Sequence, residues 1–264
     1  MKLKINSYPT ISIITPSFNQ GKFIEETIKS VVEQEYPNLE YVIKDARSTD
    51  NSLKIIQKYA AKYPKIIKWV SKEDKGQTDG INQGIKMATG EIIAYLNSDD
   101  LYLPNTFQTV AEYFTQHPEA QWVTGDYFII DEEGRKIQSF VATYKRLLRR
   151  NPTFTKLAIA NYIIQPSTFW RRSMMKKIGT FDASLRYCMD YDYWMRAINQ
   201  SPPHVINRHF SLFRIHQASK GGTQYKRQFE EEHRVLKRYT SNSFLLSLHK
   251  LHAAAIILAY QIIK

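Results

Sequence analysis

Short apolar runs alternate with amphipathic helical patterns over the first hundred residues, and this alternation constrains the fold more than any other feature. The runs resemble buried strands because they are short and largely apolar. They lie at 11–15, 39–44, 66–70 and 92–96, and helical patterns lie between them at 22–35, 51–63 and 79–88. Strand–helix–strand units of this kind form a parallel, right-handed, doubly wound sheet.

A different pattern follows residue 100. The predicted elements are a helix at 105–114, hairpin strands at 121–131 and 135–141, a helix at 154–160, a strand at 165–171, helices at 173–177 and 190–198, a strand at 205–216, and helices at 225–239 and 244–263. The sequence therefore predicts an α/β fold with a mostly parallel sheet, helices on both faces and additional C-terminal helices. We expect one domain over 8–240 and a separate amphipathic helix over 241–264.

A polar cluster at 97–100, Asn-Ser-Asp-Asp, ends the apolar run at 92–96 abruptly. Adjacent carboxylates at the end of a buried strand repel each other, and a divalent cation would offset that repulsion. Carboxylate oxygens are ligands that Mg²⁺ and Mn²⁺ prefer. The alternative is that one aspartate caps the helix that begins near Pro104, but a cap accounts for one aspartate only. The cluster therefore favours a metal site.

Polar loops follow two other predicted strands, TPSFN at 15–19 and DARS at 45–48, in addition to NSDD at 97–100. Ligands of open α/β sheets bind in a crevice beyond the carboxyl ends of the strands, so these loops are expected to line one crevice. The sequence has neither a GxGxxG pattern nor a P-loop, so it supports neither a dinucleotide fold nor P-loop phosphoryl transfer.

Charge is unevenly distributed along the chain. Residues 1–132 hold 14 Lys and Arg against 18 Asp and Glu, whereas residues 133–264 hold 23 against 7. A basic half suits nucleic acid, anionic lipid or a polyanionic substrate, and a solvated basic face is the alternative. Cys188 is the single cysteine, which excludes an intramolecular disulfide. With no secretory signal at the N-terminus, we expect a cytosolic protein.

The last predicted helix carries apolar residues at helical spacing. They are Phe244, Leu248, Leu251, Ala255, Leu258 and Ile262. His249, Lys250 and His252 interrupt the pattern, which makes it a poor transmembrane span. Three arrangements are compatible with it: a helix packed on the core, a helix that forms a homodimer, and a helix that lies on a membrane surface.

Seven pieces of the sequence together resemble the inverting glycosyltransferases of family two, which have the GT-A fold. They are TPSFN (15–19), DARSTD (45–50), DKGQTDGINQG (74–84), ATGEIIAYLNSDD (88–100), QPSTFWRRS (165–173), IGTFD (178–182) and MDYDYWMR (189–196). The resemblance covers nearly all of residues 10–240. It implies a Rossmann-like, mostly parallel GT-A sheet and a nucleoside-diphosphate sugar as the donor.

The resemblance also implies a donor-nucleotide site and a metal site. The expected nucleotide-binding residues are Thr15, Pro16, Ser17, Asn19, Asp45, Arg47, Ser48, Asp79 and Asn97. Asp45 would accept the imide N–H of uracil or thymine. Mg²⁺ or Mn²⁺ would be held by Asp99 or Asp100, with His216 as a further ligand from a late Arg-Ile-His segment.

The family's catalytic base corresponds to Asp190, whereas Asp192 in the same helix is expected to be structural. This assignment agrees with the chemistry, because an acceptor hydroxyl is a weak nucleophile and needs a general base. A separate cation would neutralise the departing diphosphate. The sequence departs from the family pattern at Arg47, where glycine is usual, and at Asn97, where aspartate is usual.

We therefore predict a metal-dependent, inverting glycosyltransferase that favours UDP or dTDP donors and glycosylates a glycan or lipid-linked acceptor in polysaccharide biosynthesis. The basic half would suit a pyrophosphate-linked acceptor at the inner membrane face. Nucleic acid is not expected as a partner, because the basic run at 145–150 stands alone. The alternatives are a nucleotidyltransferase, which needs a basic first loop that TPSFN lacks, and a non-catalytic basic module that binds nucleic acid or membrane.

Overall fold

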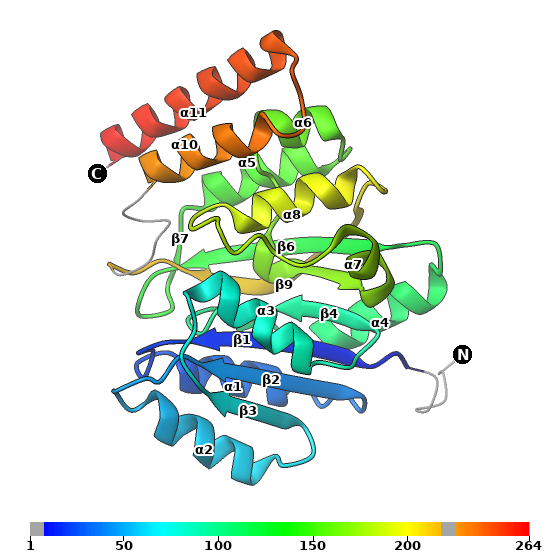
Figure 1. Cartoon of the computed structure of the whole chain (residues 1–264), viewed down its shortest axis with the longest axis vertical. Coiled ribbons are helices and arrows are strands. Elements are labelled where there is room, and N and C mark those ends of the chain that lie inside the picture. The colour runs from blue at the N-terminus through cyan, green and yellow to red at the C-terminus, as the bar shows by residue number, and fades with distance from the viewer. Residues whose placement is uncertain (1–7, 218–224, 264) are drawn as a thin grey trace.

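The computed structural model describes residues 8–217 and 225–263. Residues 1–7, 218–224 and 264 lie outside this description, and with them the last residue of the helix predicted at 241–264. The described chain forms one sheet covered by helices (Figure 1). Helices α10 and α11 lie at one end of the long axis and α2 lies at the other.

The strands are arranged in the order β3-β2-β1-β4-β8-β6-β9-β5, and β7 pairs with β6. They are β1 (Ile11–Ser17), β2 (Leu39–Asp45), β3 (Ile67–Ser71), β4 (Ile92–Tyr95), β5 (Leu101–Tyr102), β6 (Trp122–Ile130), β7 (Lys136–Ile137), β8 (Thr168–Arg171) and β9 (His204–Arg214). The order has β1 beside β4, which is the crossover expected of a doubly wound sheet.

Most strands of the sheet run in one direction. β1 is parallel to β2 and β4, and β2 is parallel to β3. β8 is antiparallel to both β4 and β6, so β6 runs the same way as β4, and β9 is parallel to β6. The prediction of a mostly parallel sheet is confirmed. As a consequence, the loops that follow β1, β2, β3, β4, β6 and β9 all emerge at one edge of the sheet.

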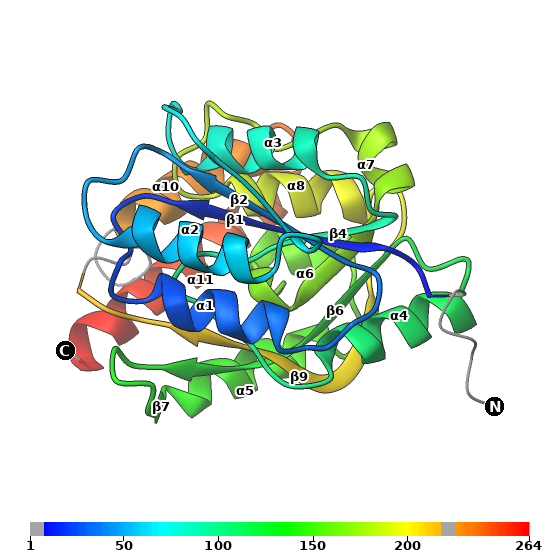
Figure 2. The same cartoon turned by 90° about the horizontal axis from the view of Figure 1, so that it is seen from below.

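Helices cover both faces, with α1 and α4 on one side and α3, α7 and α8 on the other (Figure 2). The helices are α1 (Ile24–Val32), α2 (Ser52–Lys62), α3 (Gln77–Met87), α4 (Thr106–Gln116), α5 (Ser139–Arg149), α6 (Phe154–Ile159), α7 (Arg172–Ile178), α8 (Met189–Ile198), α10 (Tyr225–Leu236) and α11 (Ser243–Ile263). Alternate strand residues face the two sides, as a pleated strand requires. Ile13 and Ala94 belong to the core beneath α1, whereas Ile14 and Ile93 belong to the core beneath α3.

Helix α3 approaches β1 closely because Gly84 lacks a side chain. A Cβ atom at Gly84 would lie 2.5 Å from Cγ2 of Ile14, a separation shorter than carbon tolerates, so a larger residue would push α3 off the sheet. At Gly80 an added Cβ atom would instead lie 2.9 Å from Oδ2 of Asp74, in the loop before α3. Gly84 thus lets α3 pack on β1, and Gly80 leaves room for the Asp74 carboxylate.

The predicted strand at 135–141 is wrong beyond Ile137. β7 contains only Lys136–Ile137, and the chain then forms helix α5, which includes most of the basic run at 145–150. Ala142 and Arg149 are buried in α5 and lie seven residues apart, on one face of the helix. Packing of that face accounts for a helix where a hairpin strand was predicted.

Other differences are smaller. The strand predicted at 165–171 begins with a 3₁₀ turn over Gln165–Ser167, and only Thr168–Arg171 is extended. The two-residue strand β5 was not predicted, and it pairs with β9. The remaining helices and strands lie where predicted, with ends displaced by a few residues.

Helix α11 packs on the protein through a different set of residues from the predicted apolar row. Leu245, His249 and Ala253 are buried, whereas Leu251 and Leu258 of the predicted row are exposed. The helix is therefore apolar on both its inner and its outer side. None of the helices in the described ranges combines the length and the apolarity that a bilayer crossing needs.

Candidate active site

The loops after β1 and β2 are joined by hydrogen bonds. The N–H of Asn19 donates to Oγ of Ser48 (2.9 Å), and Oδ1 of Asn19 accepts from the N–H of Thr49 (2.8 Å). Oδ2 of Asp50 accepts from the N–H of Gly21 (2.8 Å). Asn19 has a φ of 52°, a conformation that asparagine adopts more readily than most residues. The two loops therefore form one unit, which brings the predicted Asn19 and Ser48 together.

The predicted residues of β1 are buried. Oγ1 of Thr15 accepts a hydrogen bond from the hydroxyl of Tyr41 (3.0 Å), so this side chain belongs to the sheet interior. Pro16 pairs with Lys44 of β2. Oγ of Ser17 is buried and has no hydrogen-bond partner among the described residues. Buried hydroxyls normally have partners, so Ser17 is the residue of this strand end best suited to contact a ligand.

Asp45 ends β2 and is held by donors from the protein. Oδ1 accepts from Oγ of Ser48 (2.5 Å), and Oδ2 accepts from Oγ of Ser71 (2.6 Å) and from the N–H of Ser48 (3.0 Å). The carboxylate is fully buried. It therefore fixes the loop after β2 against the end of β3.

Arg47 lies on the outside of the same loop. Its φ is 59°, and its Nη1 donates to Oε1 of Glu73 (2.9 Å). The two side chains are 65% and 77% exposed, so this ion pair contributes little to stability. The Arg47 guanidinium is therefore largely exposed to solvent, and Glu73 holds it only weakly.

Lys44 is a buried residue at this edge that the sequence analysis did not select. Its Nζ donates to the carbonyl of Asp45 (3.0 Å), to the carbonyl of Lys72, and to Oδ2 of Asp74 (3.1 Å). The side chain is completely buried. A buried ammonium is tolerated only with such partners, and here they join the end of β2 to the loop before α3. The available signal was a lysine directly after the apolar run Tyr41-Val42-Ile43.

Asp79 lies in the first turn of α3. Its Oδ2 accepts from the N–H of Lys75 (3.0 Å) and from Nε2 of Gln83 (2.9 Å). The bond from the Lys75 N–H is the main reason that the pKa of Asp79 is lowered. A carboxylate in the first turn that accepts from a preceding N–H stabilises the start of a helix. Asp79 thus stabilises the N-terminus of α3.

The segment at 97–100, called the acidic turn below, follows β4 and is held from two sides. Oδ1 of Asn97 accepts from Nε2 of Gln77 in α3 (2.7 Å), and Nδ2 of Asn97 donates to Oδ2 of Asp100 (3.2 Å). Oδ1 of Asp100 accepts from the N–H of Arg214 (2.9 Å). Burial, and then the charge of the neighbouring aspartate, raise the pKa of Asp100 well above its usual range.

Arg214, at the end of β9, was not predicted as a site residue, yet it connects three segments of the edge. Its Nε donates to the carbonyl of Asp99 (3.0 Å), its Nη1 to the carbonyl of Glu132 (2.8 Å), and its Nη2 to Oε2 of Glu26 (2.5 Å). The guanidinium carbon lies 5.1 Å from the centre of the Phe23 ring. Arg214 therefore joins the acidic turn to α1 and to the loop after β6.

Two of the three predicted metal ligands are neighbours. Oδ2 of Asp99 lies 2.9 Å from Nε2 of His216, and their side chains are 19% and 6% exposed. The His216 ring packs against Phe23, with ring centres 4.7 Å apart. The third predicted ligand, Asp100, points inward instead, toward the backbone of Arg214.

The donor set at this position is incomplete for a protein-only metal site. Within the described residues, no three His, Cys, Asp or Glu side chains are grouped so that they could hold a metal ion. One carboxylate and one imidazole nevertheless suit Mn²⁺ or Mg²⁺ when substrate phosphates provide further oxygen ligands. The pair Asp99–His216 fits such an ion.

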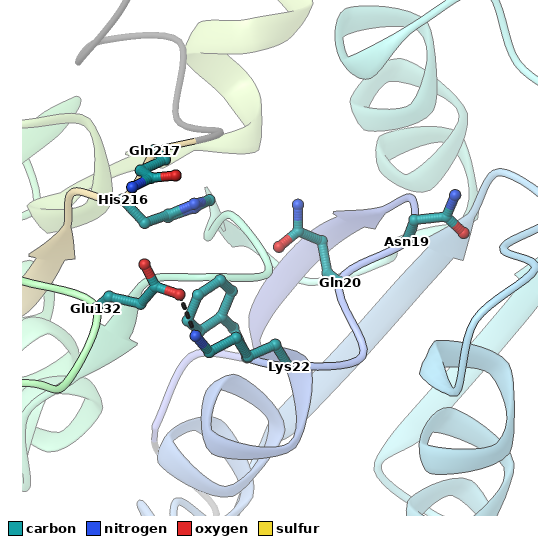
Figure 3. A pocket seen from close by; sticks show the side chains of 7 residues that line it. Asn19, Gln20, Lys22, Glu132, His216 and Gln217 are labelled. Atoms are coloured by element: carbon teal, nitrogen blue, oxygen red, sulfur yellow. Dashed lines mark hydrogen bonds and ion pairs between the residues drawn. The ribbon is translucent and has the colours of Figure 1, made fainter.

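A pocket opens beside this pair, between the loops after β1, β6 and β9 (Figure 3). It is lined by Asn19, Gln20, Lys22, Phe23, Glu132, His216 and Gln217. Lys22 and Glu132 form an ion pair at its side, as the dashed line in Figure 3 shows. The lysine is 64% exposed, so the pair is weak and its ammonium is accessible to an anion.

Asp190 lies in the first turn of α8, and its Oδ1 accepts from the N–H of Tyr191 (2.8 Å). Burial raises the pKa of Asp190, whereas the Tyr191 N–H and the positive charge of Lys145 in α5 lower it. Glu232 of α10 is a buried carboxyl in the same region, whereas Asp190 is only partly buried. Burial, and in part the charge of Asp190, raise the pKa of Glu232 to about 7.

The segment that leads into α8 is fixed by a C-terminal helix. Glu231 of α10 is buried, and its carboxylate accepts from the N–H groups of Arg186 (3.2 Å), Tyr187 (2.6 Å) and Cys188 (2.9 Å). These donors lie immediately before Asp190 in the chain. Glu231 therefore sets where the first turn of α8 begins.

Asp192 differs from Asp190 in its surroundings. Its Oδ2 forms an ion pair with Arg196, one turn along α8 (2.9 Å), and its Oδ1 accepts from the hydroxyl of Tyr239 (2.7 Å). These contacts bind α8 to the segment after α10. Asp192 thus has structural partners in α8 and in the segment after α10.

Asp190 and the acidic turn lie within electrostatic reach of a common residue. Tyr95 ends β4, and burial, followed by the charges of Asp190 and Asp100, raises the pKa of this tyrosine. Oγ1 of Thr78 in α3 donates to the carbonyl of Leu185 (3.2 Å), which connects α3 to the segment before α8. The first turn of α8 is thereby held near the same edge of the sheet as the acidic turn.

Comparison with known proteins gives a family. The profile of glycosyl transferase family 2 matches residues 12–179. The chain is 28% identical over 251 residues to the uncharacterized glycosyltransferase RT0329 of Rickettsia typhi, a match that covers 92% of this chain and 77% of that protein. It is 31% identical over 136 residues to the putative teichuronic acid biosynthesis glycosyltransferase TuaG of Bacillus subtilis, covering 52% and 54% of the two chains.

Solved structures share the fold. Staphylococcus aureus TarS in complex with UDP-GlcNAc superposes with a TM-score of 0.66 at 21% identity, over 86% of this chain and 65% of that one. The mannosyltransferase PcManGT from Pyrobaculum calidifontis, in complex with GDP-Man and Mn²⁺, gives 0.67 at 17% identity, over 98% and 81%. The predicted GT-A fold is confirmed by these likenesses. Since the family profile covers more than half of its length, the chain belongs to glycosyl transferase family 2.

Proposed function

We propose that the protein is an inverting enzyme that transfers a sugar from a nucleoside-diphosphate sugar to a hydroxyl of a glycan or lipid-linked acceptor in polysaccharide biosynthesis. The observation that carries this proposal is the presence of two separate acidic sites at one edge of the sheet: Asp99 beside the pocket, and Asp190 on α8. A single displacement needs leaving-group stabilisation on one side of the sugar and a base on the other. The likeness to TuaG, named for teichuronic acid biosynthesis, supports a polysaccharide acceptor.

The nucleotide is proposed to lie over the joined loops after β1 and β2, with UDP or dTDP favoured. Asp45 accepts three hydrogen bonds, and a carboxylate has about four acceptor positions, so one imide N–H can still be accommodated. TarS is described with UDP-GlcNAc, which supports a pyrimidine, whereas PcManGT is described with GDP-Man. The choice of base therefore needs a direct test.

The diphosphate is proposed to lie in the pocket beside His216. Lys22 lines this pocket and is held by an ion pair in which it is 64% exposed, so it can exchange its carboxylate partner for a phosphate. Arg47 lies outside the pocket, on the loop after β2, where its exposed pair with Glu73 leaves it able to contact another part of the donor. Asp99 and His216 would hold Mn²⁺ or Mg²⁺ together with diphosphate oxygens, and the bound ion neutralises charge on the departing diphosphate. Arg214 contributes by fixing the backbone of Asp99.

Asp190 is proposed as the general base. Its Oδ1 is occupied by the N–H of Tyr191, which leaves Oδ2 to accept the proton of the acceptor hydroxyl. The acceptor oxygen bonds to the anomeric carbon as the bond from that carbon to the diphosphate oxygen breaks, so the configuration inverts. The base must be ionised, and the positive charge of Lys145 favours that state in a partly buried site.

The proposal is tested first by ligand binding. Thermal unfolding is followed with UDP, dTDP, GDP and ADP, each with and without Mn²⁺. A ligand at a hundred times its dissociation constant stabilises the fold by about 2.7 kcal/mol. The increment that depends on Mn²⁺ should disappear in Asp99→Asn and persist in Asp131→Asn, an aspartate of the β6–β7 turn. Failure of every nucleotide to stabilise the protein would refute the donor site.

Stereochemistry tests the second half of the proposal. With a pyrimidine or guanosine sugar nucleotide identified by the binding screen, proton NMR of the product reports the configuration at the anomeric carbon. An inverted product supports a single displacement with Asp190 as base. A product that retains the donor's configuration would contradict that mechanism, even if the donor site is correct.

A further inference from the structure

Two helices at one end of the molecule present large apolar side chains to solvent. The exposed fractions are 55% for Phe140, 39% for Tyr144 and 51% for Leu147 in α5, and 71% for Phe244, 68% for Leu251 and 57% for Leu258 in α11. The spacings of three, four and seven residues place each set on one side of its helix. We call this surface the α5–α11 face.

The two rows belong to one continuous surface. The hydroxyl of Tyr144 lies 2.9 Å from Nε2 of His252, and the two rings are stacked with centres 6.0 Å apart. Both helices lie at the end of the long axis away from α2 (Figure 1). Among the described residues, the one other large hydrophobic side chain that is exposed is Phe18, in the loop after β1. The apolar exposure is therefore concentrated on this face.

The charge on these helices has a single sign. The segments 135–181 and 233–264 contain no aspartate or glutamate. Arg150, at the end of α5, and Lys250, in the middle of α11, are both exposed. A second copy of the chain placed on this face by two-fold symmetry would bring like charges together with no acidic partner on these segments. An anionic partner suits the face, and a self-complementary dimer does not.

We infer that the α5–α11 face lies on an anionic lipid bilayer. Apolar side chains of an interfacial helix enter the bilayer to a depth of about 5–10 Å, while its cations pair with anionic headgroups. The α5–α11 face offers both the apolar side chains and the cations. The attachment is peripheral, because the side of α11 opposite the face is packed on the protein through Leu245, His249 and Ala253.

The position of the face also bears on how an acceptor reaches the site. This step of the inference rests on the proposed function. α5 carries Tyr144 on the face and, one residue later, Lys145, whose charge acts on Asp190. Because Lys145 belongs to a helix that forms the face, the proposed base lies near that helix, within electrostatic reach of the Lys145 ammonium. An acceptor anchored in the bilayer could then reach Asp190 without leaving its lipid.

Vesicle sedimentation tests the inference. The whole protein is mixed with vesicles of phosphatidylcholine alone, or of phosphatidylcholine with one third phosphatidylglycerol. We expect strong binding only to the anionic vesicles, and loss of that binding at high salt. The double variant Leu147→Ser/Leu251→Ser removes apolar contacts, and Arg150→Glu/Lys250→Glu reverses two charges. Each should weaken partition by at least about tenfold, since one cation near an anionic surface adds about 1 kcal/mol.

Matched control variants distinguish a loss of binding through the α5–α11 face from the general effect of removing an exposed aromatic side chain or reversing two charges. Phe18→Ser removes an equally exposed aromatic elsewhere, and Lys54→Glu/Lys65→Glu reverses two exposed lysines at the α2 end. Both should leave partition nearly unchanged. Equal binding of the face variants and the controls, or binding that ignores lipid charge, would overturn the inference.

Sedimentation velocity tests whether a second copy of the chain, and not a bilayer, covers the α5–α11 face. A dimer that is present without lipid and lost in Leu147→Ser/Leu251→Ser would show that a second copy covers the face, and would overturn the inference. Mn²⁺-dependent nucleotide binding should be unchanged in the face variants. Failure of the membrane inference is thus distinguishable from failure of the proposed donor site.

Discussion

Replacing Arg214 with methionine should destabilise the protein and weaken its metal site together. Methionine keeps much of the apolar stem but loses the guanidinium, and with it both the donors and the contact over the Phe23 ring. The carbonyls of Asp99 and Glu132 then lose charged donors at 3.0 and 2.8 Å. A hydrogen bond to a charged group contributes about 1.5–3 kcal/mol, so these two losses dominate.

The contact with Glu26 adds little to this sum. Its carboxylate is 58% exposed and will be hydrated when the guanidinium is removed, so the pair is worth about 0–1 kcal/mol. The free energy of unfolding should therefore fall by about 3–7 kcal/mol. Arg214→Lys, with one donor group in place of a fork, should lie between the wild type and methionine.

Urea unfolding measures the loss, and thermal shift with nucleotide and Mn²⁺ measures the effect on the site. Arg135→Met is the matched control, because that arginine is 74% exposed in the turn after β6 and should change stability by less than about 0.5 kcal/mol. A loss below about 1 kcal/mol for Arg214→Met, with an unchanged slope against urea, would refute the reasoning. So would an unaltered Mn²⁺ requirement, because a loosened Asp99 should bind the ion less well.

Three further predictions concern the proposed site. Asp99→Asn should raise the Mn²⁺ concentration needed for transfer at least tenfold, measured by metal titration, while Asp100→Asn should mainly change stability, because its carboxylate faces inward. Asp45→Ala should weaken UDP or dTDP binding by about 1.5–3 kcal/mol in calorimetry; tighter binding of GDP than of either would argue against a pyrimidine site. Asp190→Asn should lower the transfer rate by about 10²–10⁴ with little change in donor affinity. In the wild type the rate should fall as pH drops through the raised pKa of Asp190, at a higher pH than for an exposed aspartate. Because a carboxyl with a raised pKa destabilises the fold above its unfolded pKa, Asp190→Asn should also raise stability at neutral pH. Asp192→Asn should instead keep the rate and lose about 2–3 kcal/mol through its broken pair with Arg196, measured in urea.

The part of the fold that could be predicted from sequence is the part governed by local periodicity. The apolar runs that become β1, β2, β3 and β4 have helical patterns between them, and parallel pairing follows from that order. The same logic placed the loops after β1, β2 and β4 at one edge. Two predicted residues next to strand ends, Asn97 and Asn19, therefore lie at this edge, as the sequence placed them.

The rest depends on contacts between distant segments. Arg214 meets Asp99 across 115 positions of the chain. The family resemblance implied that the Arg-Ile-His segment lies near the acidic turn, but not that the guanidinium donates to the backbone there. Lys44 is a single lysine in a strand, and its role is visible only with Lys72 and Asp74 in place. The start of α5 was predicted as the second strand of a hairpin, and the packing of Ala142 and Arg149 explains the helix instead.

The carboxylate of Glu231 has a consequence for synthesis on the ribosome. Its three N–H donors precede Asp190, yet Glu231 itself is translated more than forty residues later. N-terminal segments fold first as a chain emerges, at roughly 5–20 residues per second. The parallel strands β1 to β4 can therefore pair while the start of α8 still lacks its acceptor. We expect nascent chains that end before residue 231 to leave the segment before Asp190 open to proteases, and longer chains to protect it.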